Sequence, residues 1–152
     1  MQKIDLHSHT LVSDGSLSPL QLLQRAQANA VDILAITDHD SIEAYQQLGN
    51  QALNGLRLIA GIELSTQWRG VGVHIVGLNI DLTSTSILSG VAQQEQARSE
   101  RAQLIYQRLT KLGLAIDFER VKEIANQSNI GRPHFAQHLV EVGAVKNMAT
   151  AF

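Results

Sequence analysis

The sequence predicts an α/β fold with a largely parallel sheet. Over residues 1–80, short β-branched apolar runs alternate with segments of helical spacing, in the order strand, helix, strand, helix, strand, strand. Such alternation is typical of a sheet with helices packed on it. The chain has 152 residues, of which 44% are apolar. That is enough to bury one ordinary hydrophobic core.

Cap and turn signals locate the elements of this first part. Ser18 followed by Pro19 is typical of a helix start, and Ser41 is expected to cap a second helix. Asn54 and Gly55 form a turn signal. We expect strands at residues 3–6, 31–36, 56–64 and 71–80, and helices at residues 18–30 and 41–53.

From residue 83 onward the sequence predicts helices. A long polar stretch over residues 83–112 carries an apolar stripe and ends at Gly113. Asp117 is expected to cap the short helix that follows. We expect further helices at residues 118–126, 131–142 and 148–152, and we divide the chain into two parts, 1–82 and 83–152.

Composition excludes several kinds of site. The net charge of -2 gives no global positive field for nucleic acid or an anionic membrane, although a local basic site is compatible with it. The sequence has no cysteine, which excludes disulfides and thiolate metal ligands. Residues 1–6 form no leader-type apolar region, and no run of about 18 apolar residues occurs. We therefore expect a cytoplasmic protein.

The chemically informative residues lie where the expected strands end. His7 and His9 follow the first strand, and residues two apart in an extended chain point the same way. The carboxyl ends of parallel strands meet at one face of an α/β fold. Imidazole nitrogens and carboxylate oxygens without sulfur suit Mn, Zn or Fe. The candidate ligands are His7, His9, Asp14, His39, Glu63 at the end of the third strand, and His74 within the fourth.

Each candidate ligand also has an ordinary explanation. His7 and His9 could be surface polar residues, and Asp14 before a glycine could form a turn. Glu63 could be a solvated strand end, and His74 could be a hydrogen-bonded core histidine. A chance origin for all of them would require four successive strands each to carry a ligand-type side chain. The combined pattern therefore favours a metal site.

Four segments of the sequence resemble the motifs of the PHP (polymerase and histidinol phosphatase) domain family. The first is Ile-Asp-Leu-His-Ser-His-Thr at residues 4–10, followed by Ser-Asp-Gly at 13–15. The others are Ile-Thr-Asp-His-Asp at 36–40, Gly-Ile-Glu-Leu-Ser at 61–65 and Val-His-Ile-Val-Gly at 73–77. The resemblance implies a metal-dependent phosphoesterase on a distorted (β/α)₇ TIM-like barrel. This chain would supply an incomplete barrel and an inserted helical subdomain.

The same resemblance implies roles for the candidate ligands. Water activated by two or three divalent ions would attack phosphorus, so no side chain is expected to act as a nucleophile. The matching motifs give Asp38 and Asp40 no ligand role, and we expect them to orient the ligands or to cap the next helix. By the resemblance, His7 and His9 bind one metal ion, Asp14 and His39 bind a second, Glu63 bridges metal ions and His74 serves a third.

The helical part resembles an insertion in one bacterial branch of the family, which acts on 3′,5′-bisphosphate nucleotides and on short RNA with a 5′-phosphate. Its best match is Gly-Arg-Pro-His-Phe-Ala at residues 131–136. Backbone N–H groups at this helix start, Arg132 and His134 would bind a substrate phosphate. In the alternative reading, Pro133 merely starts a helix and Arg132 lies on its solvated side. His138 is expected to have a packing or solvent role.

Three functions stay open at this point. The first is a 3′,5′-bisphosphate nucleotide phosphatase or a 5′-3′ exoribonuclease. The second is a phosphomonoesterase of the histidinol phosphatase type, against which the Arg132 motif argues. The third is a non-catalytic metal-binding or interaction module. The complete set of early ligand positions argues against that third function.

Two later motifs of the family, a His-Pro pair and a terminal Asp-x-His, do not occur in this sequence. A complete barrel of this class takes about 250 residues. We therefore expect a truncated barrel with incomplete metal occupancy, and whether the chain alone is active stays open. Because such a barrel leaves a strand edge and an apolar face uncovered, we expect a homo-oligomer. The expected substrate is a small nucleotide phosphate or short RNA, with no membrane partner.

Overall fold

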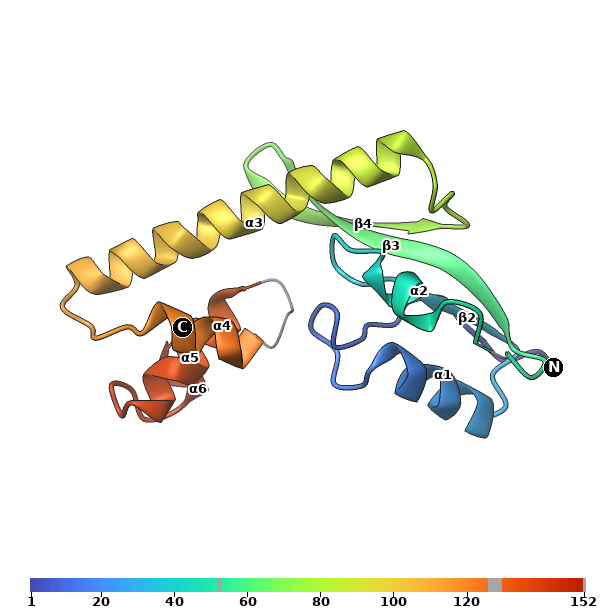
Figure 1. Ribbon diagram of the computed structural model, residues 1–152, viewed down its shortest axis with the longest axis horizontal. Coiled ribbons are helices and arrows are strands. Elements are labelled where there is room, and N and C mark those ends of the chain that lie inside the picture. Colours follow the sequence, from blue (N-terminus) through green and yellow to red (C-terminus); the bar gives the residue numbers. More distant parts are fainter. Residues whose placement is uncertain (52, 126–129, 152) are drawn as a thin grey trace. The chain divides into compact units, whose positions relative to one another are not determined.

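The computed structural model describes residues 1–51, 53–125 and 130–151. Contacts within the chain divide it into two compact units, Met1–Gln94 and Glu95–Phe152. The first unit holds a sheet and its helices, and the second consists of helices (Figure 1). Helix α3 (Thr85–Lys111) contributes to both units. Whether the helical part is an insertion that begins at residue 83 stays a prediction.

The sheet of the first unit has four strands in the order β1-β2-β3-β4. β1 (Ile4–Asp5), β2 (Ile33–Ile36) and β3 (Arg57–Trp68) are parallel, whereas β4 (Val71–Leu78) is antiparallel to β3. The long β3 curves along its length, so the sheet curls into a half-barrel (Figure 1). The mixed α/β class expected from the sequence is confirmed.

β4 is antiparallel because a tight turn joins it to β3. Arg69 and Gly70 both have left-handed backbone, with φ of 48° and 82°, as in the two-residue turns that suit twisted hairpins. The hairpin pairing continues to Trp68 and Val71. It thus extends β3 well past the residues that pair with β2. The expectation that Glu63 ends the third strand is therefore wrong, because Glu63 lies in the middle of β3.

Helix α1 (Pro19–Ala28) begins as the sequence predicted. The Ser18 side chain accepts a hydrogen bond from the Gln21 N–H, and the Gln21 side chain accepts one from the Ser18 N–H. This reciprocal pair satisfies two backbone donors that the helix leaves without partners. The buried core that joins α1 to the sheet comprises Val12, Leu23, Ala26, Leu34, Ile36, Ala44, Leu48 and Leu56.

Helix α2 (Glu43–Leu48) begins later than expected. Its N-cap is Ile42, and no side chain caps it. Ser41 is therefore not the N-cap that the sequence predicted, although its hydroxyl accepts a hydrogen bond from the Glu43 N–H at 3.2 Å. Asp40, just before this segment, has left-handed backbone with φ of 54°.

The second unit contains the later part of α3 with α4 (Phe118–Ala125), α5 (Arg132–Glu141) and α6 (Met148–Ala151). Its buried core is formed by Ala102, Val121 and Phe135. Residues 126 and 152, which the sequence placed in helices, lie outside the described residues. Among the helices of the described ranges, none combines the length and the apolar character needed to cross a bilayer.

Two predictions about single residues of this unit are confirmed. Asp117 caps α4, because its carboxylate accepts hydrogen bonds from the Glu119 and Arg120 N–H groups at 3.0 and 3.1 Å. His138 has a packing role, since it is buried and its Nε2 accepts a hydrogen bond from the Asp117 N–H.

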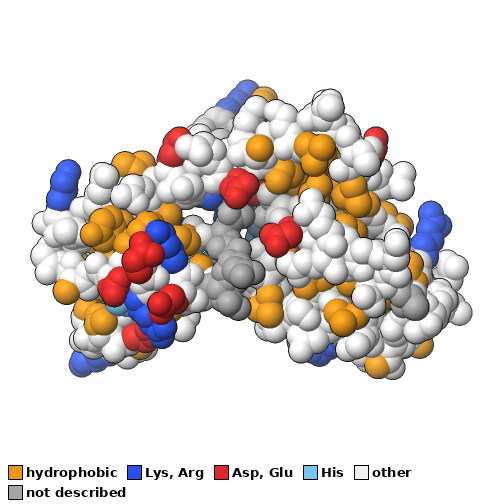
Figure 2. Space-filling model, viewed as in Figure 1, with side chains coloured by type: hydrophobic (Ala, Val, Ile, Leu, Met, Phe, Trp, Pro, Cys, Tyr) orange, Lys and Arg blue, Asp and Glu red, His pale blue; other side chains and the backbone are white. Residues whose placement is uncertain are grey.

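The surface of the second unit carries charges of both signs. On the face shown in Figure 2, acidic and basic side chains of this unit lie beside one another. Arg120 pairs with Glu123 at 2.9 Å and with Glu141 at 3.2 Å, and Lys122 pairs with Glu119 at 2.7 Å. These pairs neutralise one another locally, so they create no single-sign field for a polyanion.

The loop between His9 and Gly15 folds back on itself. The Gly15 N–H donates to the Thr10 carbonyl at 2.9 Å, and the Ser13 N–H donates to the same oxygen at 3.0 Å. A Cβ at residue 15 would lie 2.3 Å from the His9 carbonyl oxygen. Only glycine permits this approach, because the atoms in contact belong to the backbone and cannot turn aside.

Gly15→Ala should lower the free energy of unfolding by about 1–3 kcal/mol through overpacking. Urea denaturation would measure the change. Gly72→Ala is the matched control, because a Cβ at residue 72 meets nothing within 4 Å. Equal stability of the two variants would contradict the close packing of this loop.

Candidate metal centre

The structure brings six residues from four strands to one place in the first unit. His7 and His9 follow β1, Asp14 lies in the loop after them, and His39 follows β2. Because β1 and β2 are parallel, their carboxyl ends lie at the same edge of the sheet. Glu63 in β3 and His74 in β4 complete the set.

The carboxylate of Glu63 is the centre of this group. Its Oε2 lies 2.8 Å from His7 Nε2 and 3.1 Å from His9 Nε2, and its Oε1 lies 3.1 Å from His74 Nδ1. His39 Nδ1 is 3.9 Å from Oε2. Glu63 is buried, and four imidazole rings therefore face a carboxylate that has little contact with water.

Asp14 lies against the other side of the two central histidines. Its oxygens are 3.5 Å from His9 Nδ1 and 3.5 Å from His39 Nε2. The ring centroids of His9 and His39 are 4.7 Å apart. Both histidines thus have one nitrogen towards Glu63 and the other towards Asp14.

The ligand atoms form three overlapping groups, each with all its atoms within 4.8 Å of one another. Such a set of nitrogen and oxygen donors fits divalent metal ions of the Zn, Mn or Fe type. Among the described residues, His39 Nδ1 is buried without a hydrogen-bond partner, as expected of a nitrogen whose partner is a metal ion. The groups are His7 with His9 and Glu63, His9 with Asp14 and His39, and His39 with Glu63 and His74.

Electrostatics favour the metal-binding protonation states. Burial alone would raise the pKa of Glu63, but the hydrogen bond from His7 and the charges of the surrounding imidazoles outweigh it, and the pKa falls. Burial lowers the pKa of His39, and this effect exceeds the opposite influence of the two carboxylates. At neutral pH Glu63 is therefore an anion and His39 a neutral imidazole, which are the forms that bind metals.

Asp38 holds the loop that carries two of the ligand positions. Its buried carboxylate accepts hydrogen bonds from the Thr10 N–H at 2.6 Å, the Thr10 hydroxyl at 2.7 Å and the Ser13 hydroxyl at 2.6 Å. These bonds fix the chain between His9 and Asp14. The sequence analysis missed Thr10 and Ser13, although their places inside the first motif could have indicated them.

Asp40 ties the loop after β2 to β3. Its carboxylate accepts a hydrogen bond from the Ser65 N–H at 2.6 Å, and its own N–H donates to the Glu63 carbonyl at 2.9 Å. Neither Asp38 nor Asp40 caps α2, whose N-cap is Ile42 without a side-chain bond. The capping alternative for these two residues is therefore wrong.

Arg132 and His134 lie at the start of α5 in the second unit. The Gly131 N–H donates to His134 Nδ1 at 2.9 Å, and the His134 N–H donates to the Gly131 carbonyl at 3.1 Å. Pro133 has no N–H. The Gly131 and His134 N–H groups are thus engaged within the chain, and the phosphate-binding role of this helix start stays a prediction. Burial lowers the pKa of His134, so its ring is neutral at pH 7 and carries its proton on Nε2.

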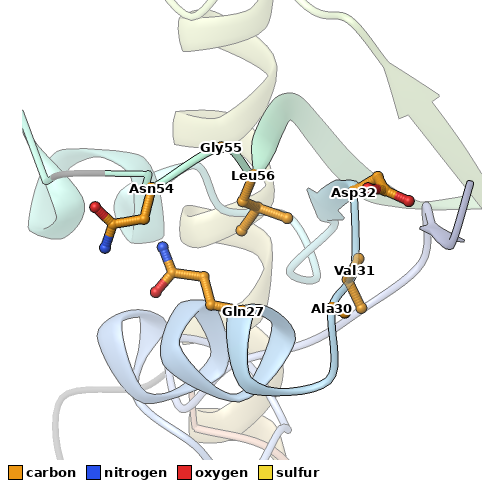
Figure 3. A pocket seen from close by; sticks show the side chains of 7 residues that line it. All are labelled: Gln27, Ala30, Val31, Asp32, Asn54, Gly55 and Leu56. Atoms are coloured by element: carbon orange, nitrogen blue, oxygen red, sulfur yellow. The ribbon is translucent and has the colours of Figure 1, made fainter.

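A shallow pocket lies at the opposite end of the parallel strands. It is lined by Gln27, Ala30, Val31, Asp32, Asn54, Gly55 and Leu56, where β2 and β3 begin (Figure 3). Its one charged lining side chain, Asp32, accepts a hydrogen bond from the Lys3 N–H at 2.7 Å. The carboxylate in the pocket wall is thus bonded to the backbone of its own chain, and the lining residues include no cluster of ligand-type side chains.

The lowered pKa of His39 has a consequence for the metal-free chain. At pH values between the lowered pKa of His39 and its ordinary pKa of 6.5, the folded chain binds fewer protons at this side chain than the unfolded chain does. The stability that His39 contributes is present above pH 6.5 and is lost as pH falls. The free energy of unfolding should therefore rise with pH from 5 to 7 in the presence of a chelator.

His39→Gln should flatten this slope in urea denaturation series measured across that pH range. Part of the slope should remain, because burial also lowers the pKa of His134. His134→Gln is the matched variant and should remove that remaining part. An unchanged slope in His39→Gln would contradict the assignment.

Comparison with known proteins places the chain in a family. The PHP domain family matches residues 5–112. The 5′-3′ exoribonuclease Rnm of Escherichia coli is 43% identical over 152 residues, which cover 97% of this chain and 52% of that protein. The 3′,5′-nucleoside bisphosphate phosphatase of Chromobacterium violaceum is 39% identical over 154 residues, which cover 100% and 54%. The chain thus spans about half the length of these relatives.

A solved structure agrees with these matches. An amidohydrolase from Chromobacterium violaceum, crystallised with bound sulfate and no metal, superposes with a TM-score of 0.82 at 39% identity and covers 99% of this chain and 54% of that one. The motifs, the converging histidines and carboxylates, and the shared fold lead to one conclusion: the chain belongs to the PHP domain family.

Proposed function

We propose that this chain carries the metal-binding part of a phosphoesterase that hydrolyses phosphate esters of nucleotides. One observation carries the proposal: three overlapping groups of imidazole and carboxylate ligands share Glu63, His9 and His39. Ligands shared in this way hold neighbouring metal ions, and paired metal ions are typical of phosphoryl-transfer sites.

The geometry supports a specific division of the ligands. His7 and His9 would bind one metal ion, Asp14 and His39 a second, and His74 a third, with Glu63 between them. The short distances from the Glu63 oxygens to three imidazoles agree with a bridging role. Bound metal ions would polarise the phosphoryl group and lower the pKa of a water from about 15.7 towards about 7. The metals proposed are Mn, Zn or Fe.

The protein's own groups hold and shape this centre. Asp38 and Asp40 fix the loops that carry His9, Asp14 and His39 through the hydrogen bonds described above. Such support preorganises the ligands and reduces the cost of ordering them when a metal ion binds. The proposed scaffold is a distorted (β/α)₇ barrel of which this chain forms the first strands, with the helical part from residue 83 as an insertion.

Nucleotide phosphates are the proposed substrates. The relatives named above are a 3′,5′-nucleoside bisphosphate phosphatase and a 5′-3′ exoribonuclease, and the Chromobacterium violaceum structure holds sulfate, which has the shape of phosphate. Arg132 would bind a non-reacting phosphate with its guanidinium fork, and the Nε2–H of His134 would add a donor. A substrate of the histidinol phosphate type carries one phosphate and would leave these groups unused.

The proposal is tested by metal titration of the chelator-treated chain, followed by assay of phosphate release from a 3′,5′-bisphosphate nucleotide with Mn²⁺. We expect metal binding at more than one site and metal-dependent release. His9→Ala should abolish release and should remove metal binding at the two ligand groups that contain His9, while the group of His39, Glu63 and His74 keeps all its ligands. Metal binding without release would show that this chain alone is not a phosphoesterase, and no metal binding would overturn the proposal.

Arg132→Ala should raise KM for a bisphosphate nucleotide by about 10–100-fold, as the loss of a charge-assisted hydrogen bond predicts. For a nucleotide with one phosphate, KM should change much less. Arg108→Ala, which removes an exposed cation from the same unit, is the control and should change neither value. Equal effects of Arg132→Ala on both substrates would contradict the phosphate-binding role.

Self-association is the second part of the proposal. β4 is the last strand of the sheet, and its Val71 and Ile75 side chains are 65% and 55% exposed. A second copy that pairs with the β4 edge and packs on the face that carries these side chains would remove the apolar surface from water. We expect light scattering to give a mass above that of the monomer and Ile75→Lys to reduce it. A clean monomer at high concentration would contradict this.

A further inference from the structure

The hydroxyl of Tyr45, on α2, lies between β2 and β3. It accepts hydrogen bonds from the Gly61 N–H at 2.7 Å and from the Ile36 N–H at 3.2 Å. It also contacts the Ile59 carbonyl oxygen at 3.0 Å and the Ile36 carbonyl oxygen at 2.5 Å. A tyrosine hydroxyl has two lone pairs and one proton. It therefore accepts from both N–H groups and donates its single proton to one of the two carbonyl oxygens at a time.

These four backbone atoms belong to consecutive steps of the parallel ladder. Ile36 pairs with Ala60, and in a parallel pair the residue on one strand bonds to the neighbours of its partner. The ordinary ladder would join the Ile36 N–H to the Ile59 oxygen and the Gly61 N–H to the Ile36 oxygen. The Tyr45 hydroxyl contacts both donors and both acceptors, so it bridges the two strands at this step.

The bridged step stands directly before the metal centre. Beyond it the pairing continues, as the Glu63 N–H donates to the Asp38 carbonyl at 3.2 Å and the Asp40 N–H donates to the Glu63 carbonyl at 2.9 Å. His39 and Glu63 face each other in this pairing. The separation of β2 and β3 at Ile36 therefore determines where the His39 ring lies relative to the Glu63 carboxylate.

The Tyr45 hydroxyl stays protonated over the pH range in which the protein would work. Burial raises the pKa of Tyr45 to about 12, so the hydroxyl keeps its proton at neutral pH. The ring packs against the main core of the unit. Removal of the hydroxyl alone would therefore leave the packing of the ring and take away the bridge.

We propose that Tyr45 is a positioning residue of the metal centre, whose hydroxyl fixes the separation of β2 and β3 so that His39 and Glu63 can share a metal ion. This inference rests on the metal site of the proposed function. Within the described part of the chain, the Tyr45 hydroxyl bonds only to backbone atoms, so its effect must pass through the backbone of Ile36 and Gly61.

The experiment is calorimetric titration of the chelator-treated chain with Mn²⁺ and Zn²⁺, for the wild type and for Tyr45→Phe. We expect the variant to bind metal about 10–100-fold more weakly, as loss of a group that orients ligands usually does. The loss should fall mainly on the two ligand groups that contain His39. Tyr106→Phe, which removes a hydroxyl from the second unit, should bind as the wild type.

A general loss of stability is separated from positioning by Leu48→Ala. Leu48 is buried in α2, and its truncation should lower the melting temperature more than Tyr45→Phe while it leaves metal affinity unchanged. Equal affinity of Tyr45→Phe and wild type would overturn the inference. So would a loss of affinity in Leu48→Ala as large as in Tyr45→Phe, because the effect would then follow from stability.

A metal-free measurement distinguishes failure of this inference from failure of the metal site. In NMR spectra of the metal-free chain, the ring signals of His39 and the amide signals of Ile36 and Gly61 should shift in Tyr45→Phe and not in Tyr106→Phe. Absence of these shifts overturns the positioning role. If the shifts occur and the wild type binds no metal, the hydroxyl still positions His39, and the metal-binding function is what fails.

Discussion

The buried carboxylate of Glu63 is the constraint around which the first unit is organised. A buried anion is costly unless it is paired and hydrogen-bonded, and here three imidazoles lie within 3.1 Å of its two oxygens. The packed imidazoles are also unfavourable without a cation, because each neutral ring has a nitrogen lone pair and close packing directs these lone pairs towards one another. Divalent cations would satisfy both demands at once. The same arrangement explains why burial and charge shift the pKa values of Glu63 and His39 towards the metal-binding forms.

Rigid elements bring these groups together from distant parts of the chain. β1, β2 and β3 are parallel. The histidines follow the ends of β1 and β2, and Glu63 lies within β3. His74 lies in β4, where it pairs with Ser65 of β3. Loops are softer than strands, and the loop that carries the candidate ligand Asp14 is held by the bonds of Thr10 and Ser13 to Asp38 and by the close packing of Gly15. A site held on strands keeps its geometry better than one held on loops alone.

The sequence predicted the residues of this centre better than their structural setting. Ligand-type side chains at strand ends and the helix caps Ser18 and Asp117 are local signals, and local signals can be read from neighbouring residues. The position of Glu63 within β3 depends on pairing with β4, which no local pattern reveals. The role of Tyr45 is hidden for another reason. An aromatic residue on the inner side of a helix looks like ordinary core, and only coordinates show a hydroxyl between two strands.

Under the proposed function, the charge distribution favours recognition of phosphate ends over recognition of a long polyanion. A protein that binds nucleic acid along its length gains affinity by neutralising many phosphates with Lys and Arg. This chain has a net charge of -2, and Arg120 and Lys122 of its helical unit are engaged with carboxylates. Under the proposed function, affinity would come from the metal centre and from Arg132 with one further phosphate.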